Sequence, residues 1–154
     1  MDKQERKLKT EQLKRKVKKE AALHVLFEEC MDALGDNTRI YSLDESVRVI
    51  ARLVSSFPFT NWGSVDWTSV ERKISLHDVE EIRKLDEFEN DNELLIIWDE
   101  MNLPVVESTL ERILNHFDDV EAVGFNTWIV NMEMNKLIEK SHDGRITFGK
   151  YDRN

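Results

Sequence analysis

The chain has 154 residues, 40% hydrophobic and 34% charged, with a formal net charge of −9. This length suits one domain with its own hydrophobic core, and no apolar run approaches the roughly 18 residues of a membrane-spanning helix. No apolar segment follows the charged N-terminus, as it would in a secretory signal. Cys30 is the single cysteine, which excludes an internal disulfide. A lone thiol is typical of a reducing cytoplasm, so we expect a cytoplasmic protein with Cys30 buried as a small hydrophobic residue.

The charge is divided unevenly along the chain. Residues 1–20 hold nine Lys or Arg and four Asp or Glu, a net charge of +5, which leaves −14 on residues 21–154. We therefore predict a single domain, 1–154, made of a basic helical extension (1–20) and an acidic body (21–154). Such a body repels nucleic acid and attracts basic partners. The extension could be an arm for nucleic acid or membrane, but interspersed acids and the lack of aromatic residues favour a solvated lead-in to a helix.

The first part of the chain is predicted to be helical. Residues 2–34 lack Gly and Pro, and their later apolar positions follow helical spacing, so this later half should pack on the core. Gly35 suits the position just after the helix. Ser42 and Glu45 form a capping box that begins a second helix. Its inward face is predicted to consist of Val47, Ile50, Ala51 and Val54.

An aromatic loop follows the second helix. Phe57, Phe59 and Trp62 surround Pro58 and Gly63. Because large aromatic side chains contribute most when they are buried, a loop packed over the core is favoured over an exposed aromatic contact site.

The next segment is less regular. Residues 65–74 alternate poorly and predict a short irregular strand. Ser75 suits the N-cap of a third helix, which would face the core with Leu76, Val79, Ile82 and Leu85.

Residues 93–99 carry the clearest strand signal. They form an unbroken β-branched and aromatic run that ends in Asp99, as in strands buried on both faces. A helix is predicted over 107–117. Further strands are predicted over 120–124, 127–131, 136–140 and 145–150, with a type I′ turn at Asp143-Gly144 joining the last two.

These elements predict the fold class. A strand–helix–strand unit prefers a right-handed parallel crossover, so strands 93–99 and 120–124 should run parallel. The fold class is therefore α+β, with N-terminal helices packed on a mixed, largely antiparallel sheet of four to five strands that contains one strand–helix–strand unit.

The sequence contains no recognised catalytic or cofactor motif. The four histidines are scattered without zinc-type spacing, and the glycines form no nucleotide-binding pattern. Asp99 and Glu100 end the buried strand, where α/β enzymes often hold ligands, and supply an enzymatic alternative, a metal-dependent hydrolase. Glu133 and Lys136 do not supply the Glu-x-Lys pair that such a site would need on a neighbouring strand, because their spacing is wrong. We expect no enzymatic activity, no cofactor and no bound metal.

Two groups of acidic residues flank strand 93–99. If strands 93–99 and 120–124 are parallel, both groups lie at one end of the sheet, where their fields would add and speed encounter with a basic partner. A solvated, solubilising surface is the alternative. The predicted binding residues are Asp86, Glu87, Glu89, Asp91, Glu93, Asp118, Asp119 and Glu121.

Motifs in the C-terminal part are similar to those of a known group. They are Ile97-Trp98-Asp99-Glu100, Leu103-Pro104, Phe117-Asp118-Asp119-Val120, Thr127-Trp128-Ile129 and His142-Asp143-Gly144-Arg145-Ile146-Thr147. This pattern resembles small cytoplasmic immunity proteins of bacterial polymorphic toxin systems, both the contact-dependent inhibition type and those paired with secreted nuclease toxins. The basic segment 1–20 is not part of the resemblance.

The resemblance implies a protein that binds the C-terminal domain of a cognate toxin in the producing cell and blocks its active site. Nuclease toxins are often basic because they bind phosphate backbones, so the acidic body and the resemblance agree on a basic nuclease as partner. Direct binding to nucleic acid or membrane is not expected. A helical adaptor that pairs through residues 1–34 with another protein or a second copy is the main alternative.

Overall fold

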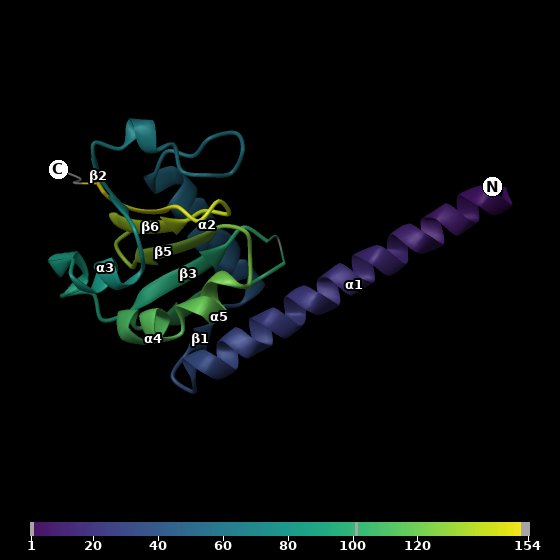
Figure 1. The fold of residues 1–154 in the computed structure, drawn as a ribbon, viewed down its shortest axis with the longest axis horizontal. Coiled ribbons are helices and arrows are strands. Elements are labelled where there is room, and N and C mark those ends of the chain that lie inside the picture. Colours follow the sequence, from purple (N-terminus) through teal and green to yellow (C-terminus); the bar gives the residue numbers. More distant parts are fainter. Residues whose placement is uncertain (1, 101, 152–154) are drawn as a thin grey trace.

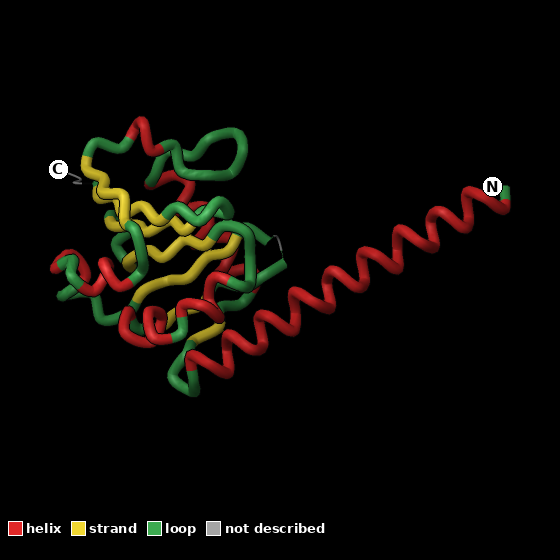
Figure 2. Tube along the Cα trace, viewed as in Figure 1, coloured by secondary structure: helices red, strands yellow, loops and turns green. Residues whose placement is uncertain are grey.

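The computed structural model describes residues 2–100 and 102–151, which form one seven-stranded sheet with helices packed on both faces (Figures 1 and 2). The strand order is β1-β4-β3-β5-β6-β7-β2, and every neighbouring pair is antiparallel. The strands are β1 (Arg39–Ile40), β2 (Arg72–Leu76), β3 (Leu94–Trp98), β4 (Val106–Ser108), β5 (Thr127–Asn131), β6 (Lys136–Lys140) and β7 (Ile146–Lys150). The α-helices are α1 (Lys3–Leu34), α2 (Leu43–Ser56), α3 (Glu80–Arg83), α4 (Leu110–Asn115) and α5 (Phe117–Glu121), with 3-10 helices η1 (Trp67–Ser69) and η2 (Asp86–Phe88).

The sheet separates two hydrophobic cores, and the inner strand β3 contributes to both. All five of its residues are buried, as predicted, because alternate side chains point to opposite faces and both faces are covered. Leu94, Ile96 and Trp98 pack with α1, α4 and α5, whereas Leu95 and Ile97 pack with α2 and the loop that follows it. Cys30 of α1 is fully buried in the first core, which confirms its predicted role as a small hydrophobic residue.

Helix α1 confirms the predicted long helix. The Asp2 side chain accepts a hydrogen bond from Glu5 N, and Gly35 with φ of 91° ends the helix. Its last turns enter the core, but residues 2–14 are exposed and its first half extends away from the body (Figure 1). The helix is continuous through residue 20, and the division into an extension and a body stays a prediction.

Helix α2 begins at the predicted capping box of Ser42 and Glu45, but its predicted inward face is wrong. The buried residues are Ser46, Val49 and Leu53. Ser46 is accepted in the interior because its Oγ accepts a hydrogen bond from Val105 N at 2.9 Å. Of the predicted face, Ile50 is half-buried, whereas Val47, Ala51 and Val54 are exposed.

The predicted parallel strand–helix–strand unit is wrong, because residues 120–121 belong to α5 and the chain returns in β5, antiparallel to β3. Phe117, Val120 and Val123 are buried at a spacing of three, which suits a helix rather than a strand. The sheet has more strands than the four to five predicted, partly because β1 and β4 span only two and three residues.

Two local predictions also need correction. Ser75 lies inside β2 instead of capping a helix, and the helix that follows is limited to α3. The hairpin of β6 and β7 is confirmed, but its turn is not type I′, since that turn needs positive φ at both central residues and Asp143 does not have it. Gly144 alone has a positive φ, 91°, and its N–H donates to Ser141 O.

Candidate functional site

The two predicted acidic groups lie at opposite ends of β3. Residues 86–93 precede its first residue, Leu94, whereas α5 packs near its last, where Trp98 Nε1 donates to Val120 O at 2.8 Å. The prediction that both groups share one end of the sheet is therefore wrong, because it depended on a parallel strand at 120–124. The fields of the two groups act on different parts of the surface.

Three of the eight predicted acidic residues form ion pairs with lysines at strand ends. Glu87 pairs with Lys150 at 3.2 Å, Asp91 with Lys136 at 3.0 Å, and Glu121 with Lys140 at 2.7 Å. These pairs offset part of the local charge. Asp119 is half-buried. The exposed members of the set are Asp86, Glu89, Glu93 and Asp118.

Asp99, the carboxylate proposed for an enzymatic alternative, has a structural contact. Its Oδ1 accepts a hydrogen bond from Phe125 N at 3.1 Å, and a Cβ on Gly124 would lie 2.9 Å from the same oxygen. Asp99 thereby fixes the turn that leads into β5. Within residues 2–100 and 102–151, no three His, Cys, Asp or Glu side chains are grouped so that they could hold a metal ion.

The aromatic loop is packed over the core at its base and exposes one aromatic side chain at its tip. Phe57 is 3% exposed and belongs to the second core. The Phe59 and Trp128 rings pack edge to face, with 5.7 Å between the ring centroids. Trp62, in contrast, is 92% exposed at the tip of the loop. The predicted packing over the core holds for the base of the loop only.

Hydrogen bonds within the loop hold the backbone around Trp62 in one conformation. Thr60 N donates to Ser64 O at 2.8 Å, Gly63 N donates to Thr60 O at 3.2 Å, and Trp62 N donates to Thr60 Oγ1 at 3.3 Å. Gly63 adopts φ of 84°, a conformation that glycine takes without strain.

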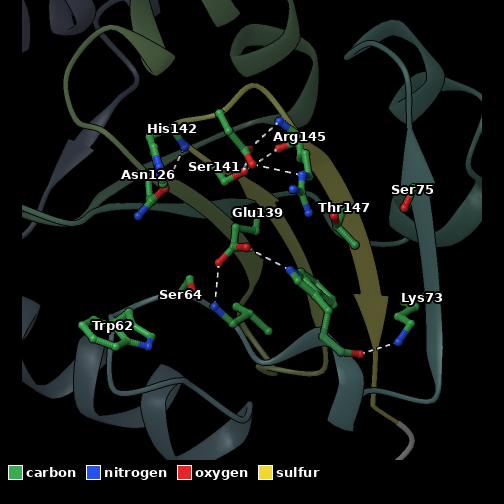
Figure 3. A pocket seen from close by; sticks show the side chains of 13 residues that line it. Trp62, Ser64, Lys73, Ser75, Asn126, Glu139, Ser141, His142, Arg145 and Thr147 are labelled. Carbon is green, nitrogen blue, oxygen red and sulfur yellow. Dashed lines mark hydrogen bonds and ion pairs between the residues drawn. The ribbon is translucent and has the colours of Figure 1, made fainter.

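Glu139 of β6 ties this loop to the sheet (Figure 3). The residue is 4% exposed, and its carboxylate accepts three hydrogen bonds: from Val65 N (2.8 Å), Trp67 Nε1 (2.9 Å) and Trp128 Nε1 (2.8 Å). Burying a carboxylate is unfavourable unless such donors surround it. Sequence analysis missed Glu139, because its partners at 65 and 67 are more than 70 residues away in the chain.

Two pockets lie on either side of the loop. One, of about 390 Å³, is lined by several charged or titratable residues, among them Lys73, Glu139, His142 and Arg145 (Figure 3). The other, of about 380 Å³, is mainly apolar and lies between α2, Phe59 and the strands β3 and β5. Trp62 contributes to the first pocket and its neighbour Gly63 to the second.

Comparison with known families identifies one that matches most of the chain. The model of the family described as CdiI immunity protein EcoliA0-like matches residues 24–149. The chain belongs to this family. It is thus an immunity protein of a contact-dependent inhibition toxin system, as the motifs between residues 97 and 149 indicated. The family match contains the sheet, α2 and the aromatic loop, whereas most of α1 precedes it.

A search of curated proteins finds no match to this immunity protein. None of the described helices is long and apolar enough to cross a membrane.

Proposed function

We propose that this immunity protein is a non-enzymatic inhibitor that acts in the cytoplasm and blocks the active site of a basic toxin domain, a nuclease. Membership of the CdiI immunity family is the observation that carries the proposal, because these proteins neutralise a cognate toxin. The charge of −14 on residues 21–154 supports a basic partner. Nucleases need basic surfaces to bind phosphate backbones, and an acidic protein competes for such surfaces.

The proposal includes the eight predicted acidic residues as toxin-facing groups of unequal weight. Glu87, Asp91 and Glu121 are paired with lysines, and their fields are partly offset. Exposed carboxylates act mainly on the rate of encounter, because solvent weakens each individual contact. We therefore assign the steering of the toxin chiefly to Asp86, Glu89, Glu93 and Asp118.

The test uses the full immunity protein and the toxin domain encoded beside it. The toxin's nucleic-acid cleavage should stop at one equivalent of immunity protein, and the two should elute as one complex. Cleavage that continues with excess immunity protein would refute the proposal. Inhibition of a toxin that cleaves no nucleic acid would refute the nuclease assignment alone.

A further inference from the structure

Helix α2 is apolar on two sides: one is buried against the sheet, and the other packs only through Ile50 and is otherwise exposed. Val47 is 66% exposed and Val54 is 52% exposed, with the half-buried Ile50 between them. These three residues follow a spacing of three and four, so they form one stripe on the helix. A helix that needs only one packed side normally places polar residues on the other. An exposed apolar stripe of this kind is typical of a surface that binds a partner.

Trp62 is 92% exposed in the loop that borders this stripe. Phe59 and Gly63 of the loop line the same pocket as Ile50 and Val54, whereas Trp62 lines the pocket on the other side of the loop. Tryptophan is highly buried on average in folded proteins. Its backbone is nevertheless held by the loop's own hydrogen bonds, and the loop is fixed to the sheet by the buried carboxylate of Glu139. A rigidly presented tryptophan loses little conformational freedom on binding, and tryptophan is enriched among the residues that dominate interface energies.

The apolar pocket connects the stripe to the loop. Its apolar lining includes Ile50 and Val54 of α2, Phe59 of the loop, Ile97 of β3 and Trp128 of β5. Asp99 and Glu100 also line it, and the described lining contains no Lys, Arg or His. The two carboxylates therefore favour a partner whose apolar side chain enters the pocket next to a basic residue, rather than next to an acidic one.

We propose that the toxin binds at this face, which we call the Trp62 surface: Trp62, Phe59, Ile50, Val54, Asp99 and Glu100. The occupant is a segment of the basic toxin domain that inserts an apolar side chain into the pocket and places a Lys or Arg beside Asp99 and Glu100. This inference rests on the proposed function and deepens it. The exposed acidic residues speed encounter, whereas the Trp62 surface holds the complex together.

The experiment measures toxin affinity by calorimetry for the full chain and three variants, with a catalytically inactive toxin domain as the probe. Trp62→Ala should weaken binding about thirtyfold, as the loss of a central aromatic anchor does. Val54→Lys should weaken it at least tenfold, because it places a charge in an apolar pocket that faces a basic partner.

Val25→Lys is the matched control. Val25 is also 52% exposed and helical, but it lies on α1, which packs on the opposite face of the sheet. Its affinity should stay within about twofold of the unaltered protein, as expected for a surface change outside the interface. Thermal unfolding of all three variants checks that the fold is intact.

The outcomes separate this inference from the proposed function. If the unaltered protein inhibits the toxin while Trp62→Ala or Val54→Lys keeps its affinity, the Trp62 surface is not the interface and the proposed function stands. Equal losses in Val54→Lys and Val25→Lys also overturn the inference. A dimer that Trp62→Ala converts to monomers without loss of toxin affinity would mean that a second copy covers this face. If the unaltered protein does not bind the toxin, both proposals fail.

Discussion

At the scale of single residues, Glu139 makes three contacts that sequence patterns did not reveal. Its carboxylate is buried and satisfies three N–H groups from the loop and from β5. The interaction is strong because the acceptor is charged and each distance is short. The loop that carries Trp62 is thus held by a side chain of β6 as well as by its own hydrogen bonds.

Glu139→Gln should destabilise the protein by about 1–3 kcal/mol, because the amide turns an N–H₂ toward donors and leaves a buried N–H without an acceptor. Urea unfolding measures this free energy. Glu133→Gln, an exposed change in the turn between β5 and β6, is the control and should shift stability by less than about 0.5 kcal/mol. An equally small effect at Glu139 would contradict a structural role for its charge.

Cys30 makes stability depend on pH in the alkaline range. Burial, with a smaller effect from Asp119, raises the pKa of the Cys30 thiol to about 12 from an ordinary value of 9.0. Below pH 9 the Cys30 thiol keeps its proton in both the folded and the unfolded chain, so the free energy of unfolding does not change with the ionisation of this thiol. Between pH 9 and 12 only the unfolded chain releases it, so the free energy of unfolding should fall as pH rises.

Unfolding at pH 7 and pH 10.5 tests this, with Cys30→Ala as comparison. The variant should lose less stability between the two pH values than the unaltered chain, although Tyr41, whose pKa is also raised to about 12, adds its own decline to both. Identical declines would show that Cys30 does not contribute. The native thiol should also react slowly with a disulfide reagent at pH 8, because so little thiolate is present.

At the scale of elements, local sequence patterns predicted where helices and strands form, whereas tertiary contacts decided which side of a helix is buried. The capping box of Ser42 and Glu45 and the end of α1 at Gly35 depend on neighbours in the chain, and β3 is marked by a short local run of apolar residues. All three were predicted correctly. The inward side of α2 was predicted wrongly, because two sides of this helix carry apolar residues at helical spacing. Only packing against β3 and β5 selects Val49 and Leu53 as buried.

Helix α1 allows the adaptor alternative to be tested. Leu8 and Leu13 are 56% and 63% exposed on its projecting half. If this half is a solvated lead-in, deletion of residues 2–20 should leave the oligomeric state, the unfolding temperature and toxin affinity unchanged, because the core residues described on this helix, Phe27, Cys30 and Leu34, all follow residue 20. Sedimentation and calorimetry measure these. A change in oligomeric state after the deletion would support the adaptor instead.

At the scale of the whole molecule, the acidic body and the Trp62 surface should control different steps of binding. Long-range charge acts before contact and is screened by salt, whereas buried apolar contacts act after it. The association rate with the toxin should fall by roughly tenfold between 50 and 500 mM salt. The dissociation rate should change far less.

Surface plasmon resonance separates the two steps. The double variant Asp86→Lys, Glu89→Lys should lower mainly the association rate, and Trp62→Ala should raise mainly the dissociation rate. Both acidic positions are exposed, so the fold should tolerate the change. Association that is insensitive to salt and to this charge reversal would argue against an acidic steering surface.

The sequence by itself determined the α+β class, the long first helix, the capped second helix, the buried strand at 93–99 and the final hairpin. Each depends on periodicity, capping or turn residues within a short stretch of chain. Its motifs also indicated the immunity family, which the match over residues 24–149 confirmed. Only the tertiary structure decided the antiparallel return of β5, the separation of the two acidic groups and the role of Glu139. These depend on contacts between residues as far as 74 positions apart, such as Glu139 with Val65, and local pattern carries no information about such contacts.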